Sequence, residues 1–71
     1  MQTEHLQDRF LHLLRTERTP IVLFLVNGFQ IRCSIVAFDA FAVLVMADGK
    51  QELIYKHAIS TIIPSVPVKL N

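Results

Sequence analysis

The sequence predicts a mainly β protein in which an N-terminal α-helix precedes a five-stranded, strongly bent antiparallel sheet that forms a small barrel. Apolar residues recur at helical spacing before Pro20 and at strand spacing after it. The dipeptides Asn27-Gly28 and Asp48-Gly49 divide the second region as hairpin turns do. The 71 residues are expected to form one domain, with the helix at about 6–18, the barrel at about 20–64 and a short tail at 65–71.

The expected helix has one apolar face. Residues at i, i+4, i+7 and i+8 line this face, and they are Leu6, Phe10, Leu13 and Leu14. The helix should end before Pro20, because Thr19 precedes the proline and is therefore pushed toward an extended conformation.

Five strand-sized segments follow the proline. We expect strands at residues 21–26, 29–38, 41–47, 51–55 and 59–63. The second segment alternates apolar and polar residues until Val36 and Phe38 put apolar groups on the other face, which indicates a bend that serves two surfaces. Short sequential strands with such a bend are typical of a small closed barrel.

The composition indicates an oligomer. Hydrophobic residues make up 52% of the chain, and so small a core is seldom stable without disulfides, a metal or association with other subunits. Cys33 is the only cysteine, and no paired Cys or His spacing predicts a zinc site, so no metal or cofactor is expected. We expect a reducing cytoplasm and a ring in which copies pair through exposed strand edges.

Neither export nor a membrane is expected. Residues 1–9 are polar and mixed in charge, unlike a secretory signal, and the apolar runs are far shorter than the roughly 18 residues of a membrane span. The net charge of +1 means that nucleic-acid binding would depend on local clusters of basic and aromatic side chains, which a ring would repeat.

Several segments of the chain occur together in a known family. They are LQD followed by Phe10, then LVNGFQI, FDAF, and YKHAIST with Pro64 behind it, of which YKHAIST is the most specific. From about Leu6 to Val68 the chain resembles the Hfq family of bacterial Sm-like RNA chaperones. The resemblance implies a cytoplasmic homohexamer that is not an enzyme. It would bind single-stranded RNA and promote pairing of small regulatory RNAs with messenger RNAs in post-transcriptional regulation and the stress response.

The resemblance implies three RNA-binding surfaces. The proximal set, around the pore on the helix side, is expected to bind uridine-rich RNA and comprises Gln7, Phe41, Tyr55, Lys56 and His57. An exposed aromatic ring stacks on a base, an amide reads its Watson–Crick edge, and a lysine holds phosphate or other oxygen acceptors. From the pattern alone, Phe41 would be a core residue, Lys56 a solvated turn residue and His57 a structural hydrogen-bonding residue.

The distal set is expected to bind adenosine-rich RNA. It comprises Phe24, Leu25, Asn27, Gly28, Phe29, Gln30, Ile31, Arg32 and Glu52. Phe24 and Phe29 can serve as stacking platforms, although paired strand aromatics also occur as core. Phe24 stands where tyrosine is frequent, and Arg32 and Glu52 stand where the family carries glutamines that read adenine, so base specificity is open. Arg32 can add a phosphate contact, and Glu52 can accept from an adenine amino group.

The rim set comprises His12, Arg15, Arg18 and Phe38. The stretch RTER at residues 15–18 is a sparser basic patch than many members carry, so weaker rim binding and RNA annealing are expected. Cys33 occupies a strand position that is commonly glycine in the family. A small cysteine can be tolerated there, or it can introduce strain or altered curvature.

The main alternative is a ring-forming Sm-like or SH3-like barrel that serves as a protein-interaction module, with its aromatic residues in the core. An enzyme is least expected. Asp8 and His12 lie one helical turn apart, but no nucleophile, carboxylate dyad or metal-ligand set accompanies them, so we interpret them as a structural pair.

Overall fold

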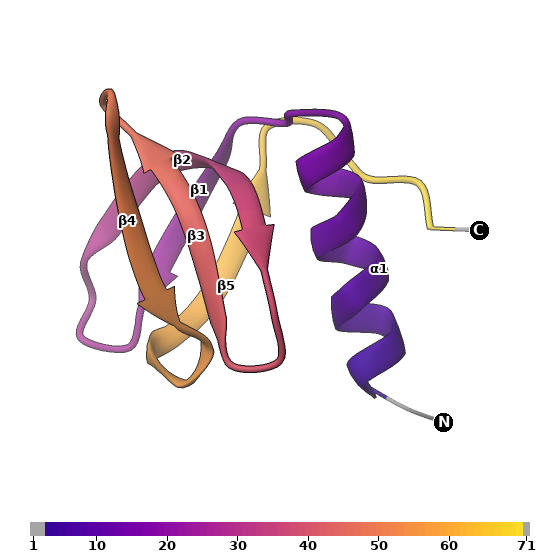
Figure 1. Ribbon diagram of the computed structural model, residues 1–71, viewed down its shortest axis with the longest axis horizontal. Coiled ribbons are helices and arrows are strands. Elements are labelled where there is room, and N and C mark those ends of the chain that lie inside the picture. The colour runs from indigo at the N-terminus through magenta and orange to yellow at the C-terminus, as the bar shows by residue number, and fades with distance from the viewer. Residues whose placement is uncertain (1–2, 71) are drawn as a thin grey trace.

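The computed structural model describes residues 3–70 and contains one helix and five strands. They are α1 (Thr3–Thr16), β1 (Ile21–Leu25), β2 (Gln30–Phe38), β3 (Ala42–Ala47), β4 (Lys50–Tyr55) and β5 (Ile59–Pro64), with a 3-10 turn at Lys56–Ala58. Figure 1 shows α1 beside the strongly bent sheet, with β4 on the far side from it. The predicted helix and five-stranded antiparallel sheet are confirmed, and only the ends of the elements shift by a few residues.

The helix ends at Thr16, two residues earlier than predicted, because Arg18 adopts the left-handed conformation with φ 53°. The Arg18 N–H donates to the Arg15 carbonyl at 3.2 Å, and the Thr19 N–H donates to the Leu14 carbonyl at 3.1 Å. These two bonds form a Schellman motif, which satisfies the last helical carbonyls and turns the chain. The chain then enters β1 through Pro20.

The helix buries a face slightly different from the predicted one. Leu11 and Leu14 are buried, at 3% and 0% exposure, whereas Leu6 is 53% exposed. The helix meets the sheet mainly at β2, so the buried stripe lies along the middle of α1 and leaves Leu6 outside. The core side chains with no exposure are Leu14, Leu23, Val43 and Val45.

β2 lies at the centre of the strand order β4-β3-β2-β1-β5, and all its pairings are antiparallel. Its first half, residues 30–33, pairs with β1, and its second half, residues 34–38, pairs with β3. The register shifts between Ile35 and Ala37, which leaves Val36 as a bulge. The predicted bend in this strand is confirmed, and β4 and β5 are the two edges of the sheet.

The two predicted turns differ in type. Asp48 and Gly49 have φ values of 57° and 79° between the paired residues Ala47 and Lys50, as in a two-residue type I′ hairpin. The Asn27-Gly28 turn is longer. The Leu25 N–H donates to the Phe29 carbonyl at 2.8 Å, so three residues form the loop and left-handed Gly28 closes it.

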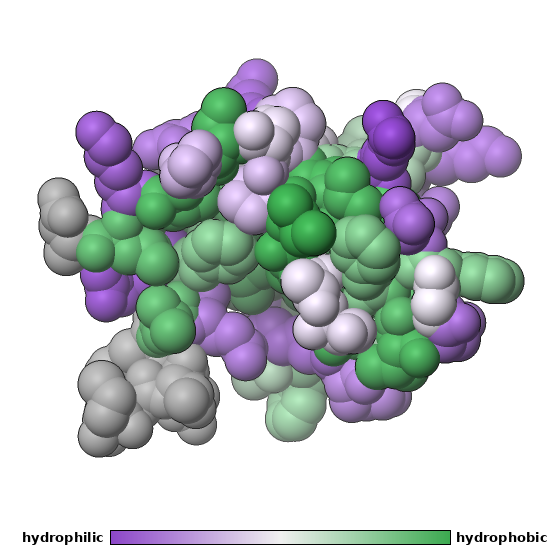
Figure 2. Space-filling model, turned by 180° about the vertical axis from the view of Figure 1, so that it is seen from behind, coloured by the Kyte–Doolittle hydropathy of each residue, from purple (hydrophilic) through white to green (hydrophobic). Residues whose placement is uncertain are grey.

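Many large apolar side chains remain on the surface. Figure 2 shows apolar residues over much of the face opposite to the view of Figure 1. Leu53 on β4 is 58% exposed, and Ile63 on β5 is 50% exposed, so each edge strand carries an exposed apolar side chain. Within residues 3–70, no helix has the length and apolar character that a membrane crossing requires.

Candidate functional site

Phe41 lies outside the core, in the turn that joins β2 to β3. The Asp39 carboxylate accepts hydrogen bonds from the Phe41 and Ala42 backbone N–H groups, both at 2.8 Å. These two bonds, and more weakly the nearby Lys56 ammonium, lower the pKa of Asp39. The turn held in this way leaves Phe41 76% exposed, so the core assignment that its apolar strand suggested is wrong.

Three members of the proximal set come from separate segments and meet beside this turn. The Lys56 backbone N–H donates to the Phe41 carbonyl at 2.8 Å, which ties the 3-10 turn to the β2–β3 turn. Gln7 from α1 and Lys56 both line a cavity of about 260 Å³. An amide, an ammonium and an exposed aromatic ring therefore lie in one region of the surface.

Tyr55 and His57 flank Lys56 and stack on one another. Their ring centroids are 5.9 Å apart with an interplanar angle of 12°, and both side chains are exposed. Lys56 lies half-buried between them in the chain, with Nζ 5.7 Å from the Phe38 ring centroid. The structure therefore gives His57 a stacking contact with Tyr55.

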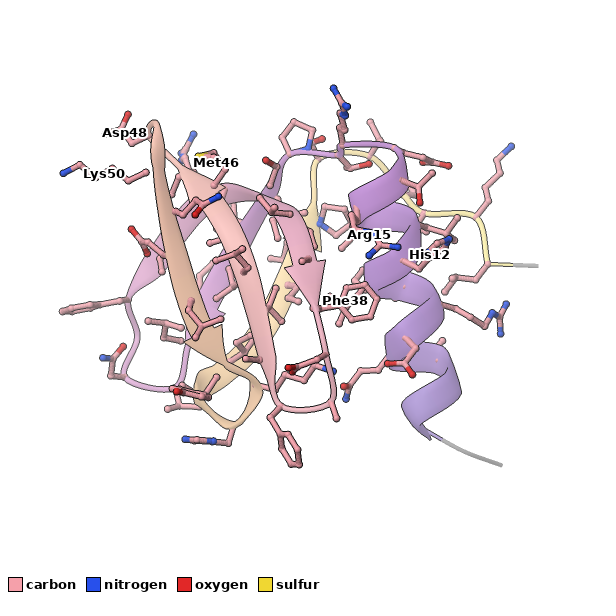
Figure 3. The ribbon with its side chains drawn as sticks, in the orientation of Figure 1. His12, Arg15, Phe38, Met46, Asp48 and Lys50 are labelled. Carbon is pink, nitrogen blue, oxygen red and sulfur yellow. The ribbon has the colours of Figure 1, made fainter. Side chains whose placement is uncertain are left out.

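Three members of the rim set form one cluster (Figure 3). Arg15 donates from its guanidinium to His12 Nδ1 at 3.0 Å, and its Cζ lies 5.4 Å from the Phe38 ring centroid. His12 Nε2 is 3.5 Å from the Thr16 hydroxyl. The predicted pairing of Asp8 with His12 is not the one observed, because His12 contacts Arg15 and Thr16, toward the C-terminal end of α1.

A groove of about 490 Å³ runs beside this cluster. Its lining combines basic, acidic and aromatic side chains, namely Asp8, Arg9, His12, Phe38, Asp39 and Ala40. Arg18 is exposed in the left-handed cap beyond the end of α1.

The outer face of β1 and β2 carries part of the distal set. The register pairs Phe24 with Gln30 and Val22 with Arg32, so these side chains lie on the face opposite to the buried Leu23. Two other predicted members, Leu25 and Ile31, pack against the core instead.

The loop at Asn27 and Gly28 presents Phe29. The Asn27 side-chain oxygen accepts from the Phe29 N–H at 3.0 Å, and Phe29 is 68% exposed. Glu52 is exposed on β4, which is separated from β2 by β3 in the strand order, although its carboxylate lies close enough to Cys33 on β2 to interact with the thiol.

Sequence reasoning missed the contribution of β5 to this face. Thr61 pairs with Phe24 and Ile63 pairs with Val22. A cavity of about 470 Å³ lies there, lined by Phe24, Leu25, Val26, Gly28, Ser60, Thr61 and Ile63. The β1–β5 pairing joins distant parts of the chain, and periodicity within one segment carries no signal for it.

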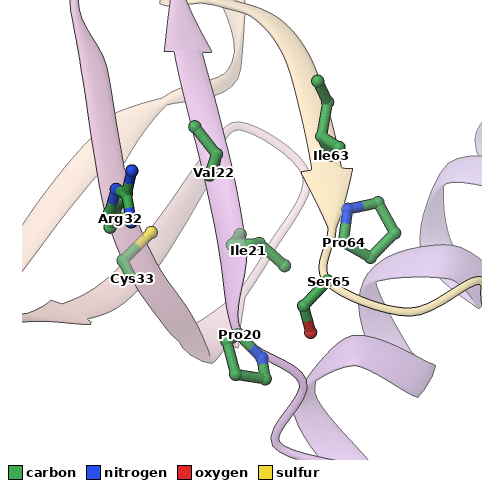
Figure 4. Close-up of a pocket in the computed structure, with 8 residues that line it drawn as sticks. All are labelled: Pro20, Ile21, Val22, Arg32, Cys33, Ile63, Pro64 and Ser65. Carbon is green, nitrogen blue, oxygen red and sulfur yellow. The ribbon is translucent and has the colours of Figure 1, made fainter.

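Cys33 faces another hollow, near the start of β1 (Figure 4). This hollow has a volume of about 250 Å³ and is lined by Pro20, Ile21, Val22, Arg32, Cys33, Ile63, Pro64 and Ser65. Burial, and more weakly the Glu52 carboxylate, raise the pKa of the Cys33 thiol to about 11. Cys33 pairs in regular register with Ile21 on β1.

Among the described residues, no group of three or more His, Cys, Asp or Glu side chains is arranged to hold a metal ion. The arrangement is instead one of exposed aromatic rings, amides and basic groups on separate surfaces.

Comparison with known proteins places this arrangement in context. The model of the family described as Hfq protein matches residues 6–69. The RNA-binding protein Hfq of Moorella thermoacetica is 56% identical over 66 residues, which cover 93% of this chain and 79% of that protein. The RNA-binding protein Hfq of Bacillus licheniformis is 50% identical over 71 residues, which cover 100% and 97%. A crystal structure of the pleiotropic translational regulator Hfq matches with a TM-score of 0.80 and 41% identity over 82% of this chain and 97% of that chain.

Proposed function

The chain belongs to the Hfq family, and on this premise we propose that it is an RNA-binding chaperone that promotes pairing of small regulatory RNAs with messenger RNAs. The observation that carries the proposal is the exposure of two phenylalanines in turns, Phe41 at 76% and Phe29 at 68%, with Lys56 bonded to the turn of Phe41. Large aromatic side chains that are exposed to solvent in so small a protein are well suited to stack on bases. The protein acts by binding and not by catalysis.

The proximal set binds uridine-rich RNA. Phe41 supplies a stacking surface, the Gln7 amide reads the edge of the base, and the Lys56 ammonium holds an oxygen acceptor or phosphate. The proximity of Lys56 to both Phe41 and Gln7 supports this assignment. The stacked rings of Tyr55 and His57 extend the same surface.

The distal set binds adenosine-rich RNA. Phe24 and Phe29 provide stacking surfaces, Asn27 and Gly28 shape the loop, and Arg32 neutralises a phosphate. The exposure of both Phe29 and Arg32 supports this role.

The chains assemble into a homohexameric ring in the cytoplasm. The sheet has two free edges, β4 and β5, and each carries an exposed apolar residue. Pairing of β4 in one copy with β5 in the next covers both edges and closes a ring. The same pairing brings Glu52 of one copy toward the distal set of its neighbour, where its carboxylate accepts from an adenine amino group.

The rim set assists annealing of RNA pairs. The cluster of Arg15 with Phe38 supports a contact that combines charge and stacking. The glutamate and threonine between Arg15 and Arg18 dilute the basic charge, so annealing is slower than in relatives with a denser patch.

Two measurements test the proposal. Light scattering gives the number of subunits, and fluorescence anisotropy titrations with uridine and adenosine hexamers give the affinities. We expect a hexamer that binds both oligomers. A ring that binds neither favours the protein-interaction module, and a monomer at micromolar concentration contradicts the assembly.

A further inference from the structure

The Phe38 ring lies near two cations that the proposed function assigns to different surfaces. The Arg15 Cζ is 5.4 Å from the ring centroid, and the Lys56 Nζ is 5.7 Å from the same centroid. Both distances fall within the roughly 6 Å reach of a cation–π interaction. Because both cations are measured to one centroid, they lie at most about 11 Å apart. The rim and proximal sets therefore meet at this ring.

The ring itself is fixed by the fold. Phe38 is the last residue of β2, pairs with Val43 on β3 and packs, half-buried, against the core. A side chain packed in this way offers a stationary surface to its neighbours.

The two cations differ in how else they are held. The Arg15 guanidinium has a second contact, its hydrogen bond to His12. Lys56 is anchored through its backbone by the Phe41 carbonyl, and the Asp39 carboxylate lies close enough to interact with its charge. Lysine has a long flexible side chain that loses conformational entropy when it binds RNA. An aromatic ring that holds the ammonium before binding reduces this entropy cost.

We infer that Phe38, besides its place in the rim set, is a positioning residue of the proximal set, whose ring holds the Lys56 ammonium in place for uridine-rich RNA. The inference rests on the proposed function, because Lys56 must contact RNA for its position to affect binding. Phe38 acts through Lys56 and needs no contact of its own with the bound uridine.

The first test compares Phe38→Leu, which keeps an apolar side chain of similar size, with Phe38→Tyr, which keeps the ring. Phe38→Leu should weaken binding of a uridine hexamer by about two- to fivefold, the ratio that an exposed cation–π contact gives. Phe38→Tyr should retain most of the parent's affinity for the uridine hexamer. With ring assembly verified by light scattering, Phe38→Leu should lower the affinity for the uridine hexamer by a larger factor than the affinity for an adenosine hexamer.

A double-mutant cycle identifies the partner of the ring. In a Lys56→Ala background, Phe38→Leu should change uridine affinity by less than about twofold, because the cation that it positions is absent. In an Arg15→Ala background the full effect should remain. The inference would be overturned if Phe38→Leu lowered uridine affinity equally with and without Lys56. It would also be overturned if Phe38→Leu lowered this affinity only when Arg15 is present.

A second measurement needs no RNA. In protein labelled with ¹³C at lysine Cε, the Lys56 resonance is assigned by its absence in Lys56→Ala. Ring currents should shift this resonance in the parent and in Phe38→Tyr, and the shift should disappear in Phe38→Leu. No ring-current shift in the parent would overturn the inference. Failure of the parent to bind any uridine oligomer would instead reject the proposed function, and the resonance would still show whether the ring holds Lys56.

Discussion

Replacing Phe41 by alanine should weaken RNA binding and leave the stability of the fold nearly unchanged. Phe41 is 76% exposed, so folding removes only about a quarter of it from water. Full burial of such a side chain contributes about 1.5–3 kcal/mol, so the substitution should lower the free energy of unfolding by less than about 1 kcal/mol. Removal of one base-stacking interaction should cost about 1–3 kcal/mol of binding free energy, or roughly 5- to 150-fold in Kd for a uridine oligomer.

Phe29→Ala is the matched control, because Phe29 is 68% exposed and belongs to the proposed distal set. It should weaken an adenosine oligomer by a similar factor and leave the uridine oligomer unaffected. Anisotropy titrations of both variants with both oligomers give four affinities, and urea unfolding gives the two stabilities. The reasoning is refuted if either variant weakens both oligomers equally, or if Phe41→Ala destabilises the fold by several kcal/mol.

Further outcomes are expected at four positions or pairs of positions. Lys56→Ala should weaken uridine binding and reduce the magnitude of its logarithmic salt dependence by about 0.7 for each phosphate that the lysine no longer neutralises, with adenosine binding retained; titrations over a range of salt concentrations test this. Arg15→Ala combined with Arg18→Ala should slow annealing of complementary RNAs more than it weakens a short uridine oligomer, and equal losses would indicate a general electrostatic surface. Arg18→Gly should raise the free energy of unfolding by about 0.5–1 kcal/mol in urea titrations, because Arg18 has a φ of 53°, and Arg18→Ala should not. The Cys33 thiol, with its pKa raised to about 11, should react with iodoacetamide at pH 8 on the order of 100-fold more slowly than in the unfolded chain. The contribution of this neutral thiol to the free energy of unfolding is fully present below its ordinary pKa of 9.0 and is lost as the pH rises through about 11. Urea unfolding of the parent and of Cys33→Ser at pH 9–11 tests this, because the free energy of unfolding should fall only in the parent.

Periodicity was sufficient to predict most of the fold. Alternating apolar residues located the strands, and the change of face at Val36 located the bend that the bulge produces. The end of the helix was less accessible, because its left-handed cap is an arginine and the usual signal is glycine or asparagine. The Asn-Gly dipeptide marked a turn correctly, but not its length, which depends on the register between β1 and β2.

The candidate site was less predictable from local pattern. Phe41 occurs in an apolar run, and two hydrogen bonds to Asp39 decide that it points outward. The sequence FDAF contains the Asp that makes these bonds, but pattern alone does not distinguish this turn from a continuous strand. Thr61 and Ile63 were missed because they reach the distal face through a pairing between β1 and β5.

The strand order has a consequence for the path of folding. Three of the four pairings join strands that are neighbours in the chain, whereas β1–β5 joins residues as distant as Ile21 and Pro64. Loop-closure entropy makes such long-range pairing the slow step, so we expect β5 to dock last and to detach first in native-state hydrogen exchange. β5 is also one of the two edges of the sheet. In the proposed ring, a neighbouring copy would therefore add only to a chain that has completed its sheet, and each added copy would stabilise the strand that its partner holds most weakly.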